Sequence, residues 1–413
     1  MLPCKKPLGG VEVNRMVNKK AYELGSKRSA IRELFEYAKK RGAEIGVENV
    51  FDFSIGNPSV PAPQKVNDEI VRLTKEMPSV DLHGYTSAQG ALQARRMIAE
   101  NMQTRFGFSM DENLLYMTCG AAASLTVTMN ALTVEAGDEF LVFAPFFPEY
   151  RVFAMGAGAT LTVLPADENL QPDFEALKKA LHARVRGVII NSPNNPSGVV
   201  YTKENMQKLA AVLRDASERF GAPVYLISDE PYRELVYDAS TVVTFPMNVY
   251  ENTIICYSYS KALSLPGERI GYIAVSPKCA EAKDVYAAVC GAGRMLGFVC
   301  APALFQRVVA ACDGLTGDLS VYRKNRDLLY SGLTKCGFEC IYPDGAFYLF
   351  MKTPEADANA FCERAKKYEL LLVPGDSFGA KGYVRIAYCV STERIERALP
   401  AFEKLAKEYG LQG

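Results

Sequence analysis

The chain has 413 residues, with 47 basic and 47 acidic side chains, so its formal net charge is zero and neither nucleic acid nor a membrane is indicated as its main partner. Its eleven cysteines include no close CxxC pair and its histidines number only two, which favours a reducing compartment and argues against metal catalysis. No apolar run reaches the length of a membrane span and no signal-peptide core is present, so we expect a cytoplasmic protein.

Short apolar runs alternate with helical patterns along most of the chain. An amphipathic helix is predicted first, from Ser29 to Arg41. Five apolar runs of strand length follow, each bounded by turn residues: Leu114–Thr118, Glu139–Ala144, Val185–Asn191, Val224–Ser228 and Thr253–Tyr257. This alternation predicts an α/β fold, in which helices cover both faces of a mainly parallel sheet.

The two ends of the chain differ from this central pattern. Beyond about Phe305, helices alternate with short strands such as Ala346–Met351 and Tyr383–Tyr388. We expect residues 1–60 to join residues 305–413 in a smaller α+β domain, packed against a large domain of residues 61–304.

Ligand-binding groups are expected at the carboxyl ends of the predicted strands, where parallel sheets bind their ligands. After Thr118, small residues enter an apolar helix whose exposed amides suit an anion. Aromatic, amide, acidic and basic groups follow the other four strands, in the segments Pro145–Tyr150, Asn191–Gly198, Asp229–Tyr232 and Ser258–Gly271. Singly, each has a simpler explanation, such as core packing or a helix cap.

One ligand accounts for all of these groups together. It must offer a phosphate, a flat ring, a protonated ring nitrogen, a ring hydroxyl and an aldehyde. Pyridoxal 5′-phosphate has all of them, and a lysine holds it as a Schiff base opposite an acidic partner. Ser258 and Arg269 match the phosphate, and Phe147 matches the flat ring. Asp229 matches the protonated ring nitrogen, Asn195 with Tyr232 the ring hydroxyl, and Lys261 the aldehyde.

Four motifs give the chain a family resemblance. NNPSG at 194–198, DEPY at 229–232, SYSKALSLPGERIG at 258–271 and VRIAY at 384–388 resemble the fold-type I, class I and II aminotransferases of the aspartate aminotransferase superfamily. The resemblance extends from about Arg28 to the C-terminus. It implies the three-layer fold of pyridoxal-phosphate-dependent transferases and a homodimer with shared active sites.

The resemblance implies roles for individual residues around the cofactor. Lys261 is similar to the Schiff-base lysine and general base, Asp229 to the partner of the ring nitrogen, and Tyr232 with Asn195 to the partners of the ring oxygen. The residues expected to bind the phosphate are Gly120, Ala121, Ala122, Ser258, Ser260 and Arg269, with Tyr85 reaching the phosphate of the neighbouring subunit. Phe147 takes the stacking position, where relatives often have tryptophan or tyrosine, so stacking is kept but a hydrogen bond from that side chain is lost.

The resemblance also implies a substrate site. Arg385 is similar to the arginine that grips the α-carboxylate with its planar fork, beside Asn195, and Gly56 to a residue of the loop that covers the substrate. Arg294 has two interpretations. We favour a surface or interface arginine paired with a local acid; the alternative is an arginine that binds the distal carboxylate of a dicarboxylic substrate from the neighbouring subunit.

The expected activity is therefore that of an aminotransferase, which moves an amino group between an L-amino acid and a 2-oxo acid by a ping-pong mechanism. A β-lyase (C–S lyase) acting on sulfur amino acids is the alternative on the same scaffold. A non-catalytic regulator that senses the cofactor would need a DNA-binding module, for which we expect too little chain before Ser29. The GxxxxGK[ST] motif of a nucleotide-binding protein is absent.

Overall fold

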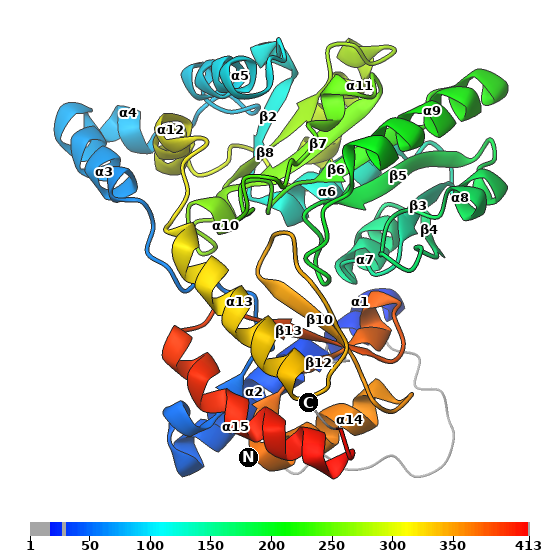
Figure 1. Ribbon diagram of the computed structural model, residues 1–413. Helices are drawn as coiled ribbons and strands as arrows, with labels where there is room; N and C mark the ends of the chain where they lie inside the picture. Colours follow the sequence, from blue (N-terminus) through cyan, green and yellow to red (C-terminus); the bar gives the residue numbers. More distant parts are fainter. Residues whose placement is uncertain (1–16, 27–29, 412–413) are drawn as a thin grey trace.

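The computed structural model describes residues 17–26 and 30–411, so Ser29, the predicted start of the first long helix, lies outside the described residues. The helices are α1 Lys19–Ser26, α2 Ala30–Ile45, α3 Gln64–Glu76, α4 Ser79–His83, α5 Leu92–Phe106, α6 Ala121–Leu132, α7 Glu149–Gly156, α8 Phe174–Ala180, α9 Lys203–Phe220, α10 Tyr259–Ala262, α11 Ala282–Met295, α12 Ala303–Cys312, α13 Leu319–Lys335, α14 Ala358–Ala365 and α15 Thr392–Glu408. The strands are β1 Phe51–Asp52, β2 Leu115–Thr118, β3 Glu139–Phe143, β4 Thr160–Leu164, β5 Val185–Asn191, β6 Tyr225–Asp229, β7 Thr253–Ser258, β8 Gly271–Val275, β9 Cys340–Ile341, β10 Tyr348–Lys352, β11 Leu370–Leu371, β12 Val373–Pro374 and β13 Tyr383–Ala387. Figure 1 shows a wide upper part built on the largest sheet and a narrower lower part that contains α2, α14 and α15.

The largest sheet has seven strands in the order β2-β8-β7-β6-β5-β3-β4. From β7 to β4 all neighbours are parallel, whereas β8 is antiparallel to both β2 and β7. Because β8 runs backwards, its amino end lies at the edge where the other strands have their carboxyl ends. The predicted mainly parallel central sheet is confirmed.

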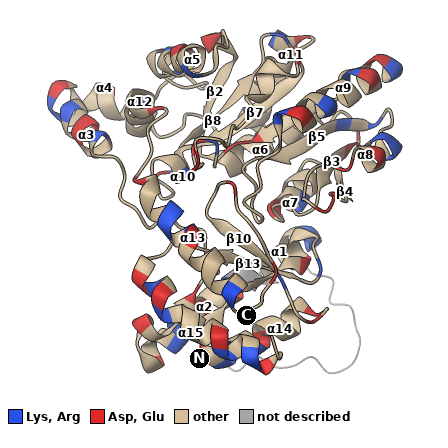
Figure 2. Cartoon of the chain, in the orientation of Figure 1, with Lys and Arg blue, Asp and Glu red and all other residues tan. Residues whose placement is uncertain are grey.

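Alternate side chains of the central strands pack in opposite directions. In β5, Val188 and Ile190 share a core with α8 and α9, whereas Ile189 between them belongs to the core of α6, α7 and α11. Helices therefore cover both faces of the sheet, as the continuous apolar strands predict. The outer sides of α8, α9 and α11 carry interspersed acidic and basic residues (Figure 2).

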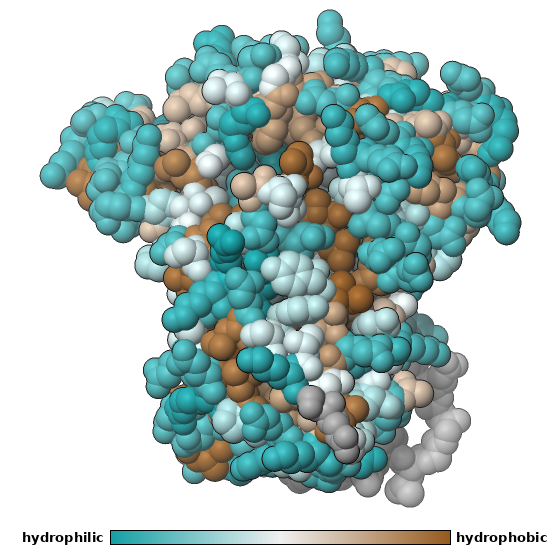
Figure 3. Space-filling model, viewed as in Figure 1, coloured by the Kyte–Doolittle hydropathy of each residue, from teal (hydrophilic) through white to brown (hydrophobic). Residues whose placement is uncertain are grey.

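A second sheet contains four antiparallel strands in the order β12-β13-β10-β9. Beside it, β1 pairs in parallel with β11, so that Phe51 lies opposite Leu370. Phe53 and Val60 belong to the same apolar core as residues of α13, α14 and α15. Phe51, Phe53 and Val60 thus pack with elements from the C-terminal part of the chain. In the space-filling view, separate patches of apolar side chains lie near the junction of the upper and lower parts (Figure 3).

The five predicted central strands correspond to β2, β3, β5, β6 and β7, each within one residue at either end. Two further strands of the sheet, β4 and β8, were not predicted. β4 is an edge strand with mostly half-buried side chains, so its apolar signal is weak. In the described part of the chain, no helix is both long and apolar enough to cross a bilayer.

Candidate functional site

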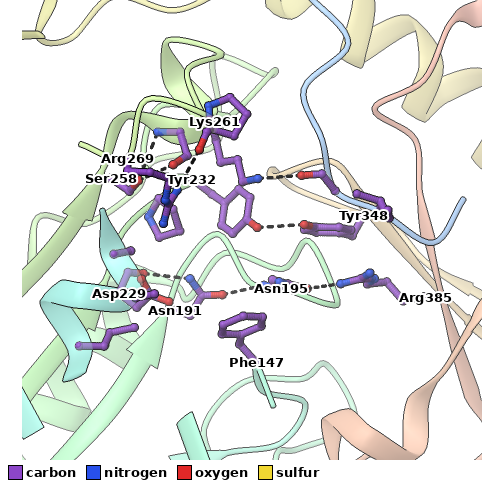
Figure 4. A pocket seen from close by; sticks show the side chains of 18 residues that line it. Phe147, Asn191, Asn195, Asp229, Tyr232, Ser258, Lys261, Arg269, Tyr348 and Arg385 are labelled. Carbon is purple, nitrogen blue, oxygen red and sulfur yellow. Dashed lines mark hydrogen bonds between the residues drawn. The ribbon is translucent and has the colours of Figure 1, made fainter. Parts of the chain in front are cut away.

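A cavity of about 280 Å³ lies between the carboxyl edge of the seven-stranded sheet and the strands β10 and β13 (Figure 4). That volume is close to the lower limit of small-molecule sites, roughly 300 Å³. Its lining residues are Ile55, Gly56, Ala121, Ala122, Leu125, Phe147, Asn191, Asn195, Asp229, Pro231, Tyr232, Ser258, Ser260, Lys261, Pro266, Arg269, Tyr348 and Arg385. Segments that are distant in sequence therefore meet at one edge of the sheet, as predicted.

The start of α6 makes one end of the cavity suitable for an anion. Gly120, the residue before the helix, has a φ of 90°, a backbone conformation that favours glycine, and it offers no side chain to cap the helix. The first amides of α6, at Ala121 and Ala122, have no partner within the helix. A Cβ on Gly120 would lie 3.1 Å from Nη2 of Arg269, so the glycine also leaves room for this guanidinium.

Two serines and Arg269 complete this end. Ser258 caps α10 by accepting a hydrogen bond from the amide of Ser260 at 3.2 Å, and the two hydroxyls are 2.7 Å apart. Arg269 precedes the reversed strand β8, has a left-handed φ of 51° and donates to the carbonyl of Pro266 at 2.9 Å. Among the described residues no acid pairs with Arg269, so its charge is available to an anionic ligand.

Lys261 lies in α10, immediately after β7, and its Nζ donates to the carbonyl oxygen of Gly56 at 2.7 Å. Burial lowers the pKa of Lys261 from 10.5 to about 8, and the charges of Arg269 and Arg385 act in the same direction. No acidic side chain in the described residues pairs with it. An appreciable fraction of this amine is therefore neutral near neutral pH, as a nucleophile or a general base requires.

Asp229 is the last residue of β6 and is buried at the base of the cavity. Its Oδ2 accepts a hydrogen bond from the Tyr150 hydroxyl at 2.6 Å, whereas its buried Oδ1 has no partner among the described residues. Burial raises the pKa of Asp229 to about 7; the Tyr150 hydrogen bond opposes this shift and the charge of Glu230 adds to it. Because a buried carboxylate oxygen without a partner is unfavourable, a positively charged N–H group of a ligand would stabilise it.

A series of hydrogen bonds leads from Asp229 across the cavity to β13 (Figure 4). The side-chain amide of Asn191 donates to the backbone carbonyl of Asp229 at 2.9 Å, and Asn191 Oδ1 accepts from the backbone amide of Asn195 at 2.7 Å. Asn195 Oδ1 in turn accepts from Nη1 of Arg385 at 3.0 Å. This series fixes the Asn195 side chain between the two halves of the site.

Arg385 forms the other cationic end of the cavity. Only 2% of it is exposed, and its Nη2 donates to the carbonyl of Ser54 at 2.5 Å. The guanidinium carbon lies 4.6 Å from the ring centroid of Tyr348 and 5.0 Å from that of Phe378. Its Nε is buried without a partner, and no acid of the described chain pairs with it. A carboxylate on the ligand would provide the missing partner.

Aromatic side chains border the space between these two ends. The Tyr232 hydroxyl is 2.9 Å from the Tyr348 hydroxyl. Phe147 lies across the cavity from Lys261 and Tyr232, with Asn195 between them (Figure 4). The space is therefore suited to a flat ring.

The structure places most of the predicted site residues around this one cavity, namely Gly56, Ala121, Ala122, Phe147, Asn195, Asp229, Tyr232, Ser258, Ser260, Lys261, Arg269 and Arg385. Gly120 lies directly before α6. Tyr85 and Arg294 do not line the cavity of their own chain: Tyr85 is 99% exposed, and Arg294 lies on α11 in a surface groove beside the far end of α6. The expected local acid for Arg294 is not found among the described residues. Tyr85 was predicted to act with a second subunit, and Arg294 only in its alternative interpretation; both roles remain predictions.

Three polar residues of the site were not predicted. Tyr150, which holds Asp229, was noted only as one of a group of aromatic residues. Asn191 has a recognisable signal, because it is a polar residue at the end of a predicted strand. Tyr348 has none, since it lies in a strand far from the motifs and its partner is a hydroxyl of another segment.

Comparison with known proteins identifies similar chains over nearly the whole length. The sequence profile of the family described as aminotransferase class I and II matches residues 48–402. An aspartate aminotransferase of Thermotoga maritima is 31% identical over 364 residues, which cover 86% of this chain and 91% of that protein. A solved amino transferase of Eubacterium rectale superposes with a TM-score of 0.94 at 56% identity, over 96% of this chain and 100% of that one. The aspartate aminotransferase of Thermus thermophilus with maleate superposes with a TM-score of 0.81 at 26% identity, over 94% and 100% of the two chains.

Proposed function

Because the chain belongs to the class I and II aminotransferases, we propose that it binds pyridoxal 5′-phosphate at Lys261 and moves an amino group between an L-amino acid and a 2-oxo acid by a ping-pong mechanism. The enzyme is a transaminase by family. The geometry of the cavity supports its cofactor, its site residues and its substrates.

The observation that carries the proposal is that two unusual groups line the same cavity. The buried Oδ1 of Asp229 has no partner, and Lys261 has a pKa lowered to about 8. A pyridine ring linked to Lys261 through its aldehyde carbon would offer Asp229 a protonated nitrogen. The remaining groups fit as well, since the start of α6 with Arg269 suits the phosphate, Tyr232 with Asn195 suits the ring oxygen, and Phe147 suits a ring face.

The bound cofactor would supply an electron sink for the charge left when the substrate α-carbon loses its proton. Lys261 Nζ would accept that proton, because its lowered pKa leaves it partly neutral. The carboxylate of Asp229 would keep the ring nitrogen protonated, while the Tyr150 hydroxyl holds the carboxylate in place.

The substrate would occupy the end of the cavity at Arg385. Its α-carboxylate would pair with the buried guanidinium of Arg385 and supply the partner that Nε lacks. The segment at Gly56, whose carbonyl already contacts Lys261, would cover the reacting atoms and exclude water. The names of the relatives make aspartate the first donor to test.

The test is a half-reaction with purified enzyme loaded with pyridoxal phosphate, without any oxo acid. A panel of L-amino acids, beginning with aspartate, glutamate and aromatic donors, should convert the visible absorbance of the lysine-bound cofactor to that of the amino form. Equimolar oxo acid should be released, as measured by liquid chromatography. Release of pyruvate or ammonia in place of the matching oxo acid would contradict transamination.

We also propose a homodimer, in which Tyr85 contributes to the partner's phosphate site. Its 99% exposure in the single chain supports such a role. Analytical ultracentrifugation should show a dimer, and a fully active monomer would contradict it. If Arg294 acts on a distal carboxylate in that dimer, Arg294→Leu should impair aspartate and glutamate while sparing alanine; equal losses would mark it as structural.

The division into domains is likewise a proposal, with residues 61–304 as the large domain and residues 1–60 and 305–413 forming the small one. The pairing of β1 with β11 and the shared core of Phe53 with α13, α14 and α15 support it. A cytoplasmic location is proposed from the sequence composition and from the scattered cysteines.

A further inference from the structure

Tyr348 occupies a central position that none of the roles above explains. It is the first residue of β10, only 2% of it is exposed, and it lines the cavity. Its hydroxyl lies 2.9 Å from the hydroxyl of Tyr232, and the two rings meet edge to face at 5.7 Å. In Figure 4 its hydroxyl points toward Tyr232, whereas its ring lies beside Arg385.

The direction of this hydrogen bond follows from the number of protons available. Burial raises the pKa of Tyr348 to about 12 and that of Tyr232 well above 10, so both hydroxyls are neutral at neutral pH. Each hydroxyl has one proton to donate and two lone pairs. If Tyr232 donates its proton to the ring oxygen of the cofactor, the bond between the tyrosines must be donated by Tyr348.

The ring of Tyr348 contacts two further parts of the site. It lies 4.6 Å below the guanidinium carbon of Arg385. A Cβ added to Gly56 would collide with the Tyr348 hydroxyl, so this glycine allows the covering segment to approach the ring. The same Gly56 accepts the hydrogen bond of Lys261 Nζ at 2.7 Å. Tyr348 therefore contacts three residues of the site: Tyr232, the proposed partner of the cofactor ring oxygen; Arg385, the proposed partner of the substrate carboxylate; and Gly56, which accepts the hydrogen bond of Lys261.

We infer that Tyr348 is a positioning residue, which donates a hydrogen bond to Tyr232 and so strengthens the hydrogen bond that Tyr232 donates to the ring oxygen of the cofactor. The inference rests on the proposed function. Two hydroxyls in series polarise one another in a buried site, so Tyr232 is a stronger donor with Tyr348 than without it. A stronger donor at the ring oxygen lowers the pH at which the neighbouring Nζ of Lys261 loses its proton.

The test is Tyr348→Phe, which keeps the ring against Arg385 and Gly56 and removes only the hydroxyl. In enzyme loaded with pyridoxal phosphate, the pH midpoint of the visible absorbance change should rise by roughly half a unit. Tyr232→Phe should raise it further. In the double variant Tyr348→Phe/Tyr232→Phe, the midpoint should equal that of Tyr232→Phe alone, because the effect of Tyr348 passes through Tyr232.

A matched control is Tyr250→Phe, which removes another buried hydroxyl, one that donates to the Val224 carbonyl at 2.7 Å outside the cavity. It should leave the midpoint unchanged, and circular dichroism with thermal melting checks that every variant is folded. A Tyr348→Phe variant that melts earlier with an unshifted midpoint, or a double variant with additive shifts, would overturn the inference. If the wild-type protein acquires no lysine-bound absorbance at all, the proposed function fails instead, so the two failures are distinguishable.

Discussion

The two cationic ends of the cavity are built in different ways. At the end formed by α6, the first residues of the helix, Ala121 and Ala122, line the cavity, and the exposed Arg269 is paired to no acid of the described chain. At the other end a single buried arginine, Arg385, is fixed by Asn195 and Ser54. Backbone amides cannot be removed by mutation, whereas Arg385 can. We therefore expect a single substitution at the α6 end to weaken cofactor binding only moderately, and substitution of Arg385 to weaken substrate binding more strongly.

The largest effect is expected from Lys261→Ala, because neither end of the cavity can replace its amine. Turnover should fall by roughly 10⁴-fold, since both the nucleophile and the base are lost. The cofactor should still bind through the anion end. Borohydride reduction followed by mass spectrometry should find no pyridoxyl group attached to the peptide that contains position 261.

Lys208→Ala is the control for this variant, since Lys208 pairs with Glu204 on the exposed side of α9. It should retain full activity and the covalent label. A Lys261→Ala enzyme that remains labelled elsewhere in the cavity would show that another group holds the cofactor.

Arg385→Leu tests the end made by one side chain. Loss of a charge-assisted contact of about 1.5–3 kcal/mol should lower kcat/KM for every amino donor by roughly 10- to 100-fold. Cofactor affinity should change little. Arg323→Leu, a change at an exposed arginine of α13, serves as control for the loss of a charge. Unchanged kcat/KM would contradict the role of Arg385 in carboxylate binding.

Arg269→Leu tests the end of the cavity that is formed by α6. The affinity for pyridoxal phosphate, measured by fluorescence or equilibrium dialysis, should fall by only about tenfold, because the α6 amides remain. Substrate KM should be nearly unchanged in fully loaded enzyme. If cofactor binding is abolished while the protein stays folded, the guanidinium and not the helix start dominates this end, and the comparison fails.

The smallest effect concerns Asp229, which lies between the two ends of the cavity, and its contribution to the stability of the folded protein. Burial raises the pKa of Asp229 to about 7, so the folded protein without cofactor binds a proton there that the unfolded chain, with an ordinary pKa of 3.8, has lost. This contribution to stability is present below about pH 4 and is lost as the pH rises through 7. Lys261 has the opposite slope only above about pH 8, where its folded form loses the proton first.

Asp229→Asn should remove that dependence. The difference in melting temperature between this variant and wild type, both without cofactor, should be smallest near pH 4 and should grow in favour of the variant by on the order of a few degrees toward pH 7. A difference that does not vary with pH would indicate that the Asp229 carboxyl has an ordinary pKa.

The sequence predicts the central sheet and the cavity to different extents. Buried parallel strands are continuous apolar runs, and their carboxyl ends must meet, so Asp229, Lys261 and Asn195 could be assigned to one site before their distances were known. The direction of β8 could not be predicted, because the apolar pattern of a strand is the same in both directions. Arg269 reaches the cavity only through that reversal.

Contacts between side chains of distant segments were also beyond prediction. The hydrogen bond of Tyr150 to Asp229 and that of Tyr232 to Tyr348 depend on how rings from separate elements pack. No pattern in the sequence records these pairs. Tyr85 and Arg294 lie at the surface, and the roles proposed for them require a second chain.

The pairing of β1 with β11 has a consequence for the order in which the enzyme is assembled during synthesis. All seven strands of the large sheet lie between residues 115 and 275, so their pairing needs nothing beyond that point. β1, in contrast, has no strand to pair with until residue 370 has left the ribosome. Ser54 and Gly56 directly follow β1 and contact Arg385 and Lys261. A nascent chain can therefore complete the α6 end of the cavity, which is the proposed phosphate site, well before it can complete the proposed substrate end.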